Sequence, residues 1–245
     1  MTQQYSGGTV RIGSVRPILD VLQEMGYHPE QVLAAAGVER QVFANPDNLL
    51  SFQGRSHLMA VCCEATGRAD FGLRVGQSGG LSAFGLVGYL AMHSPDVEQA
   101  LQNLVRHLHL HVQGASAVIE HGAKLAFFGY EIYQPTLEGA DQLEDAALAR
   151  MVNIMKALCV GEWEPREVWF THRSPQDTAP FKQFFQVPLR FDMDKAGLFF
   201  PARCLGRRVR AADPELHRLL QKRIDELEEN YRDDFPEQVR RVLHN

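Results

Sequence analysis

The stretch that decides the fold runs from residue 84 to residue 110 and reads FGLVGYLAMHSPDVEQALQNLVRHLHL. A Ser-Pro pair divides it into two apolar runs. Ser94 is expected to cap the second run with its hydroxyl, and Pro95 fits a first helical turn, where its missing N–H is not needed. Apolar residues then recur every three or four positions, as on a helix with one buried face. They are Val97, Ala100, Leu101, Leu104, Val105 and Leu108. The stretch therefore predicts a helix, a turn and a second helix.

The flanking sequence places helical patterns before this stretch and mixes them with short β-prone runs after it. Helices are expected over 15–25, 29–36, 51–66 and 70–75, and later over 139–160 and 177–185. Strands are expected over 115–120, 124–130, 166–171, 189–191 and 198–200. Helices packed on one side of a small antiparallel sheet make an α+β domain.

The chain is expected to divide into four parts. Residues 1–13 are polar and Gly-rich and should form a flexible lead-in, and residues 14–210 form the main domain. Residues 211–234 should be a helical linker, capped by Asp213, that becomes polar near its end. Residues 235–245 begin a further helix. One face of the linker carries Leu216, Leu219, Leu220, Ile224 and Leu227, so we expect it to dock on the main domain or on a second copy.

Bulk composition excludes several classes of protein. The 245 residues carry a net charge of −5, so the surface as a whole does not attract nucleic-acid phosphates. No apolar run reaches the roughly 18 residues of a membrane span, and the N-terminus lacks a signal-peptide core. The cysteines form no C-x-x-C pair, which indicates reduced core thiols in a cytoplasmic protein. They are Cys62, Cys63, Cys159 and Cys204.

The residues that offer chemistry do not form a catalytic motif. No G-x-S-x-G, H-E-x-x-H, Walker or dinucleotide-binding pattern occurs, and we expect no cofactor and no metal. His107, His109 and His111 leave alternatives open. On a strand all three would face one way and approach a metal together, whereas on a helix only the first and last share a face. One of them lining a pocket, or all three at a solvated helix end, are the other interpretations.

The order of several motifs resembles a known family. F-G-L-V-G-Y at residues 84–89, followed by S-P-x-x-x-x-A-L at 94–101, is similar to the effector-binding domain at the N-terminus of AraC/XylS-type bacterial transcription regulators, the arabinose-binding-domain type. D-F-G-L-R-V-G at residues 70–76 is similar to another step of that family. Further similar segments are 14–26, 47–66, 168–172, 180–187, 188–191, 197–205 and 210–220. Together these segments span most of residues 14–220.

The resemblance implies a regulator rather than an enzyme. It implies that residues 14–210 sense a small-molecule effector, that the protein forms a homodimer, and that promoter DNA is bound by a helix-turn-helix domain. Residues 235–245 would be the start of that domain, the rest of which is absent from this chain. Two alternatives remain: a metal-dependent small hydrolase or lyase that uses the histidines, and a stand-alone dimerising module.

A pocket for the effector is expected between the helix over 84–93 and the sheet that contains 128–130 and 168–170. Small-ligand sites need apolar walls with a few polar groups, and Gly85 and Gly88 would leave space beside the helix. The expected lining residues are Phe84, Tyr89, His93, Phe128, Tyr130 and Trp169. The competing interpretation is that these side chains fill the core.

Overall fold

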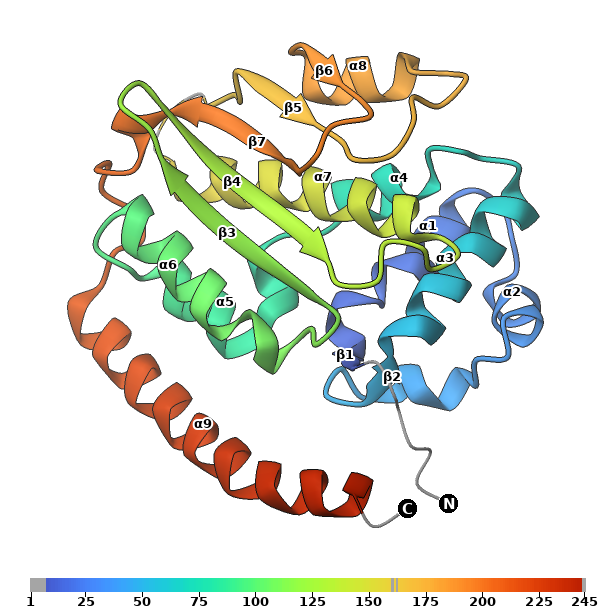
Figure 1. The fold of residues 1–245 in the computed structure, drawn as a ribbon, viewed down its shortest axis with the longest axis horizontal. Helices are drawn as coiled ribbons and strands as arrows, with labels where there is room; N and C mark the ends of the chain where they lie inside the picture. Colours follow the sequence, from blue (N-terminus) through green and yellow to red (C-terminus); the bar gives the residue numbers. More distant parts are fainter. Residues whose placement is uncertain (1–7, 160, 162, 244–245) are drawn as a thin grey trace.

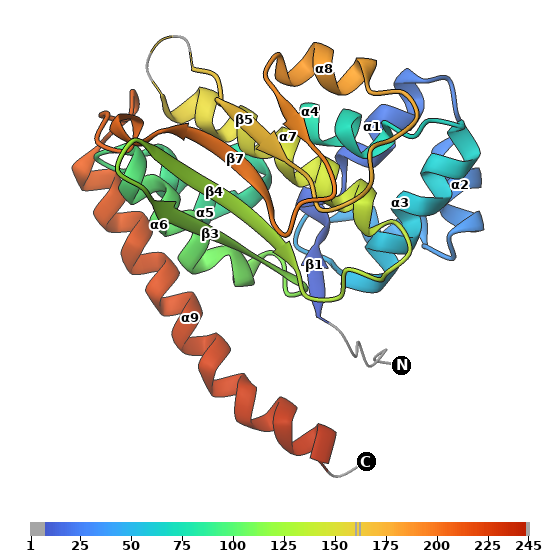
Figure 2. The same cartoon turned by 45° about the horizontal axis from the view of Figure 1, so that its top comes forward.

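The computed structural model describes residues 8–159, 161 and 163–243, with the backbone alone for residues 230–243. Its helices and two sheets confirm the α+β class. Figures 1 and 2 show the main sheet lying across a layer of helices, with the N-terminal helices beside it. The last helix runs along one edge and away from the body.

The expected elements of the main domain are present, with ends that differ by two residues or fewer. The helices of the main domain are α1 (Pro17–Glu24), α2 (Pro29–Ala35), α3 (Phe52–Thr66), α4 (Phe71–Gln77), α5 (Gly85–Met92), α6 (Val97–His107), α7 (Ala140–Leu158) and α8 (Ala179–Phe185). The main sheet has the order β3 (Ala115–His121), β4 (Leu125–Ile132), β7 (Ala196–Pro201), β5 (Glu167–Trp169) and β6 (Leu189–Arg190). Its pairings are antiparallel except that of β5 with β6, which is parallel.

Helix α7 is the centre of the domain, and α4 packs against it backbone to backbone. A Cβ atom on Gly72 would lie 2.2 Å from the Gln142 carbonyl oxygen, and one on Gly76 would lie 2.4 Å from the Ala146 carbonyl oxygen. Only glycine permits so close an approach. The two helices could not pack in this way with larger residues at positions 72 and 76.

Side chains of α7 also complete both ends of α4. The Gln142 amide oxygen accepts from the backbone N–H of Gly72 at 2.8 Å. At the other end, the amide nitrogen of Asn153 donates to the carbonyl oxygens of Gly76, Gln77 and Gly79. Helix ends leave such backbone groups without partners inside the helix. The seven-residue α4 therefore depends on α7 for its caps as well as for its packing.

A buried polar cluster ties α7 to the sheet. Glu144 accepts from the backbone N–H of Thr171 at 2.8 Å and from its hydroxyl. The Nε2 atom of His172 lies 3.0 Å from Oδ1 of Asp145. Burial lowers the pKa of His172, but the hydrogen bond and the charge of Asp145 outweigh it and raise that pKa to about 9. Burial also raises the pKa of Asp145, to about 6, so at neutral pH the imidazole is protonated and the carboxyl is ionised.

The expected flexible lead-in is wrong for residues 9–13. Thr9–Arg11 forms β1, which pairs with β2 (Leu49–Ser51), and the next turn, η1 (Ile12–Ser14), is helical. Val10 and Ile12 are fully buried, so their apolar burial fixes a segment whose polar neighbours had indicated disorder. Residues 1–7 lie outside the described residues.

The expected cap of α6 is also wrong. Asp96 is the N-cap, and its Oδ1 accepts from the N–H of Gln99 at 2.8 Å. The Ser94 hydroxyl instead donates to the carbonyl oxygen of Leu90 at the end of α5. The segment around Asp96 is extended because it forms a β-bridge with Arg208, and this pairing places the start of the helix two residues later than the Ser-Pro signal.

The expected break near residue 235 is absent from the backbone. Helix α9 (Pro214–Leu243) runs through it without interruption. Residues 228–234 contain neither Gly nor Pro, so nothing in them ends a helix. Pro236, which has no backbone N–H to donate, lies within this helix. As expected, Asp213 caps α9: its Oδ1 accepts from the N–H groups of Glu215 and Leu216.

We predict that Gly76→Ala destabilises the protein. An exposed helical Gly→Ala change gains up to about 1 kcal/mol, but here the new methyl group meets the Ala146 backbone. We expect a net loss of about 1–3 kcal/mol in the free energy of unfolding, which is typical of overpacking. Urea unfolding measures it. Gly80→Ala is the matched control, because a Cβ atom at Gly80 meets nothing within 4 Å. Equal stability of the two variants would contradict the close contact of α4 with α7.

A second prediction concerns His172 and pH. A raised folded-state pKa gives stability that is complete below the ordinary histidine pKa of about 6.5 and is lost as the pH rises through about 9. At about 1.4 kcal/mol per pKa unit, the loss is at most about 3 kcal/mol. Unfolding free energies of the wild type should fall over this window, and His172→Gln should flatten the slope. His28→Gln, at an exposed histidine, should leave the slope as it is; a wild-type slope in His172→Gln would refute the ion pair.

Candidate functional site

The candidate site is a small, partly open cavity of about 50 Å³. It lies among α3, α6, α7 and the β3–β4 hairpin, and it has room for a few water-sized groups. The apolar lining residues are Phe84, Leu104, Leu108, Val112, Ala117, Phe128, Ala147, Met151 and Ile154. The polar lining residues are Arg55, Tyr130 and Arg150. An apolar enclosure with a few polar groups is typical of a small-molecule site.

Arg55 comes from α3, where the residues buried with it share one helix face. The residue is 4% exposed, and its Nε atom is buried without a hydrogen-bond partner. Among the described residues, no hydrogen bond or ion pair is formed by Arg55. Burial lowers the pKa of Arg55, and the nearby Tyr130 offsets this only in part.

Arg150 comes from α7 and is 5% exposed. One terminal nitrogen donates to the carbonyl oxygen of Ser14 at 3.2 Å, and the guanidinium carbon lies 6.0 Å from the ring centre of Phe84. Its Nε atom, like that of Arg55, has no partner. Burial, together with the positive charge of Arg55, lowers the pKa of Arg150 to about 10. The cavity therefore holds two cations that lack a protein carboxylate.

Tyr130 brings a phenol to the same cavity from β4. Burial raises the pKa of its hydroxyl, so this group is a neutral donor and acceptor at physiological pH. The site thus combines two guanidinium groups with one hydroxyl group among apolar walls.

Of the six residues expected to line a pocket, the structure brings three together here: Phe84, Phe128 and Tyr130. The other three lie elsewhere. Tyr89 is 51% exposed, because α5 turns Val87, Leu90 and Ala91 inward and leaves position 89 outside.

His93 and Trp169 are kept from the cavity by their own contacts. The Nδ1 atom of His93 lies 2.7 Å from the carbonyl oxygen of Ala211, in the segment that leads to α9. Trp169 lies on the other face of the sheet, with its ring centre 4.6 Å from that of Phe199. Gly88 leaves no space for a ligand: its missing side chain lets the backbone of Leu81 approach, since a Cβ atom would lie 1.9 Å from that carbonyl oxygen. The structure thus does not gather Tyr89, His93 and Trp169 at this cavity, and a role for them in ligand binding stays a prediction.

The three histidines of the H-L-H-L-H stretch do not meet at one point. Helix α6 ends at His107, and after the following turn, η4 (Leu108–Leu110), Nε2 of His109 still lies 3.7 Å from Oε1 of Glu228, whereas His111 packs elsewhere. Nδ1 of His107 lies 2.7 Å from Oε1 of Glu228, while the ring centre of His111 lies 5.8 Å from that of Phe84. Within the described part of the chain, no three His, Cys, Asp or Glu side chains are placed to hold a metal ion.

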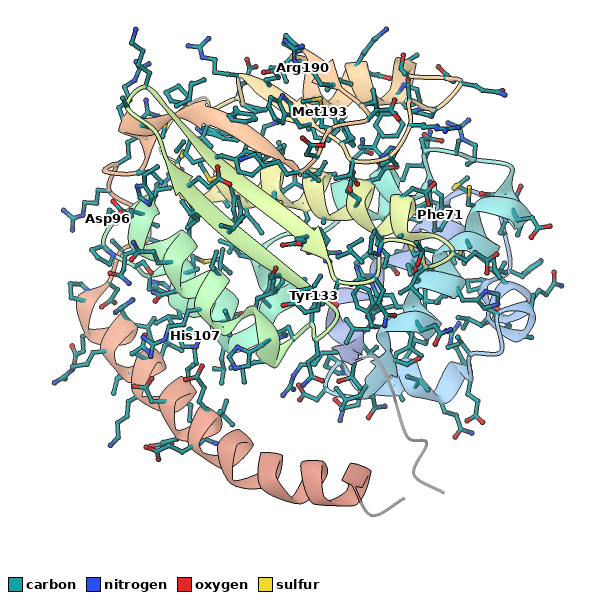
Figure 3. The ribbon with its side chains drawn as sticks, viewed as in Figure 1. Phe71, Asp96, His107, Tyr133, Arg190 and Met193 are labelled. Carbon is teal, nitrogen blue, oxygen red and sulfur yellow. The ribbon has the colours of Figure 1, made fainter. Side chains whose placement is uncertain are left out.

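Helix α9 docks on α5 and α6 through both polar and apolar contacts. The amide of Asn103 lies 3.2 Å from Nε2 of His217, and Figure 3 shows His107 between α6 and α9, where it meets Glu228. Of the five expected contact residues, Ile224 is fully buried, and Leu220 and Leu227 are partly buried. Leu216 and Leu219 are 36% and 56% exposed and remain on the outer face.

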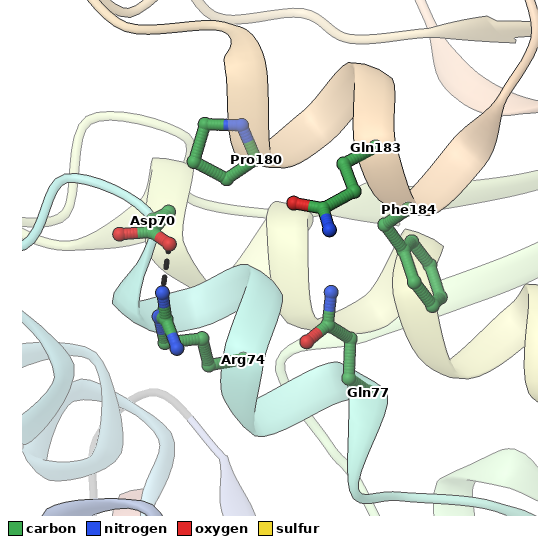
Figure 4. Close-up of a pocket in the computed structure, with 6 residues that line it drawn as sticks. All are labelled: Asp70, Arg74, Gln77, Pro180, Gln183 and Phe184. Atoms are coloured by element: carbon green, nitrogen blue, oxygen red, sulfur yellow. Dashed lines mark hydrogen bonds and ion pairs between the residues drawn. The ribbon is translucent and has the colours of Figure 1, made fainter. Parts of the chain in front are cut away.

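Two surface grooves differ from the cavity in that their charged groups already have partners. One, of about 470 Å³, lies between α4 and α8 (Figure 4), and its Asp70 forms ion pairs with Arg68 and Arg74. The other, of about 810 Å³, runs past the ends of β4 and α7 and includes Glu144 and His172, which are paired as described above. Neither groove contains a buried charge that lacks a partner among the described residues.

Sequence reasoning missed the two arginines, although a pattern in the sequence marks both. Arg150 lies seven residues after Leu143 and four before Ile154, on the same stripe of α7. Arg55 lies three residues after Phe52 and seven before Cys62, again on a buried face. A cation inside an apolar stripe is uncommon, and this position, rather than the residue type, was the available signal.

Comparison with known proteins identifies the family that this chain resembles. Residues 26–209 match the family described as "Arabinose-binding domain of AraC transcription regulator, N-term". The HTH-type transcriptional regulator VirS of Mycobacterium tuberculosis is 22% identical over 221 residues, covering 89% of this chain and 65% of that protein. The ornithine utilization regulator of Pseudomonas aeruginosa is 23% identical over 226 residues, covering 91% and 66%. The chain thus spans about two thirds of the length of these relatives.

A solved structure shares the fold. The transcriptional regulator CdpR from Pseudomonas aeruginosa matches with a TM-score of 0.63 and 14% identity, over 89% of this chain and 62% of that chain. Among the residues described here, none of the helices combines the length and the hydropathy that a bilayer span requires. With the family match extending over residues 26–209, this chain belongs to the family of N-terminal arabinose-binding domains of AraC transcription regulators.

Proposed function

We propose that this chain is the effector-sensing and signal-coupling part of a cytoplasmic AraC-type transcription regulator. The effector binds in the Arg55–Arg150 cavity, and promoter DNA is bound by a helix-turn-helix domain outside this chain. One observation carries the proposal: α6 contacts the cavity with one face and α9 with another. The net charge of −5 agrees with DNA contacts being made elsewhere.

The residues of α6 make the coupling direct. Leu104 lines the cavity, as does Leu108 in the next turn, and His107 lies between them in sequence but bonds Glu228 of α9. A ligand that moves α6 therefore acts on the bond that holds α9. Such a ligand shifts the population of α9 positions if it binds one of them more tightly.

The alternatives have less support. A metal-dependent hydrolase or lyase depended on the histidine cluster, and among the described residues these three side chains do not come together as a metal-ligand set. The relatives are transcription regulators by name, so we propose no catalytic role. A stand-alone dimerising module would give no reason for a polar cavity beside α6.

We also propose that the protein is a homodimer and that the outer face of α9 contributes to its interface. Leu216 and Leu219 are exposed on this face, and an exposed leucine pair at helical spacing favours a partner. A second copy of the same helix is the partner that the family resemblance implies.

The first prediction from this proposal concerns coupling. Glu228→Ala leaves Nδ1 of His107 buried without its partner, at a cost of about 1–3 kcal/mol. We expect amide hydrogen exchange over residues 214–229 to be roughly tenfold faster. In the full-length regulator, we expect reporter output without effector to change. Glu229→Ala, at the exposed neighbouring residue, is the control. If both variants keep wild-type exchange and wild-type output, α9 is not coupled through this bond.

The second prediction concerns assembly. Leu219→Glu should weaken the dimer in sedimentation experiments without unfolding the protein, because this side chain is 56% exposed. Lys222→Gln changes the net charge by the same amount on the same exposed helix and should sediment as the wild type does. A Leu219→Glu protein that remains dimeric at every concentration tested would place the interface elsewhere.

A further inference from the structure

Two buried guanidinium groups without a carboxylate are the unexplained feature of this molecule. Buried charges are normally paired, because removing an ion from water is costly. The domain follows this rule elsewhere: Asp70 is paired with two arginines and Asp145 with His172. Among the described residues, neither Arg55 nor Arg150 takes part in an ion pair. The positive charge of the cavity is therefore available to a ligand.

Both arginines belong to the lining of one cavity, while the guanidinium group of Arg150 also lies against Gly79 and the carbonyl oxygen of Ser14. Both Nε atoms are buried without acceptors, and both side chains line the cavity together with Tyr130. Guanidinium groups present N–H donors in a planar fork that matches the two oxygens of a carboxylate. An anion that only accepts hydrogen bonds is therefore the group that can satisfy these N–H donors.

The apolar lining of the cavity indicates the rest of the ligand, to which the anionic group is attached. The other nine lining residues are apolar, and among them Leu104, Met151 and Ile154 come from α6 and α7. A polyhydroxylated sugar would leave its hydroxyl groups unpaired against such walls, and a cationic amine would meet two like charges. An apolar tail meets neither cost. The volume of about 50 Å³ holds a carboxylate and its first carbons, so that a longer tail must displace side chains of α6 and α7.

We propose that the effector is an organic carboxylate with an apolar tail, whose oxygens accept hydrogen bonds from Arg55 and Arg150 and whose tail lies against α6. This assignment rests on the proposed function for its biological meaning, but binding itself is a property of this chain alone. It also names the driving force of the response. Ligand binding satisfies buried donors that the free protein leaves unsatisfied.

The first test is a matched ligand series on the purified chain. Hexanoate and benzoate are compared with hexanamide and benzamide, which keep the tails and lose the charge, and with inorganic phosphate. Calorimetry measures Kd, and thermal unfolding measures the shift in Tm. We expect the carboxylates to bind at least about tenfold more tightly than their amides, since hydrogen bonds to charged groups are the stronger ones. Equal binding of acid and amide, or binding of phosphate alone, would overturn the proposal.

The second test separates a binding role from a structural one. Arg55→Met removes the charge and keeps the volume. If Arg55 is held for a ligand, the variant is more stable than the wild type when no ligand is present, because replacing an uncompensated buried charge by an apolar group is stabilising. It also loses carboxylate binding. Arg55→Lys keeps the positive charge but loses the planar set of guanidinium N–H donors, and we expect it to weaken carboxylate binding about tenfold or more. Arg223→Met, at an exposed arginine, should bind as the wild type does.

The outcomes distinguish this inference from the proposed function. A destabilised Arg55→Met that still binds carboxylates shows a structural arginine and overturns the inference. If the amides raise Tm through the cavity and the acids do not, the sensor role survives and the carboxylate assignment fails. If acids bind in an Arg55-dependent way but reporter output of the full-length protein never responds, the assignment holds and the sensor role fails.

Discussion

The rest of the structure depends on the backbone-to-backbone contact between α4 and α7. Gly72 and Gly76 give α4 a surface without side chains, and Gln142 and Asn153 of α7 supply the hydrogen bonds that the ends of α4 need. Because α7 is held firmly on this side, its other side can serve as a fixed wall. That wall carries Arg150, and the sheet and α6 close the cavity around it. A charged group can be kept out of water only where the surrounding elements cannot move aside to hydrate it.

Buried polarity is used in two ways in this domain. Asp145 with His172, and Glu144 with Thr171, are satisfied within the protein and join α7 to the sheet. Arg55 and Arg150 are left incomplete at the point where three helices and a hairpin meet. Satisfied groups specify a unique packing, whereas incomplete ones store free energy that an incoming partner releases. The second use is the one expected of a sensor, whose fold must be less stable without its ligand than with it.

Much of the fold could be predicted because apolar periodicity reports directly on burial. The expected helices and strands of the main domain lie within two residues of their expected ends, since each buries one regular stripe. Long-range pairings were not predictable in this way: the bridge between Asp96 and Arg208 moves the start of α6, and the pairing with β2 orders Thr9–Arg11. The site was only half predictable. Aromatic residues indicated Phe84, Phe128 and Tyr130, but whether a side chain at Tyr89 points inward depends on which face of α5 the domain covers.

Helix α9 has a mechanical consequence. Thirty residues give it a length of about 45 Å. Among the residues whose side chains are described, its last side-chain contact with the main domain is at Glu228, near its middle. The remaining half extends beyond that contact for about 22 Å. A rotation of about 10° at that contact would carry its end sideways by roughly 4 Å, given that length. The helix therefore acts as a lever. A small displacement of α6 leaves the packing of the core intact, but it moves the far end of α9 by a distance comparable to the separation between two strands of a sheet.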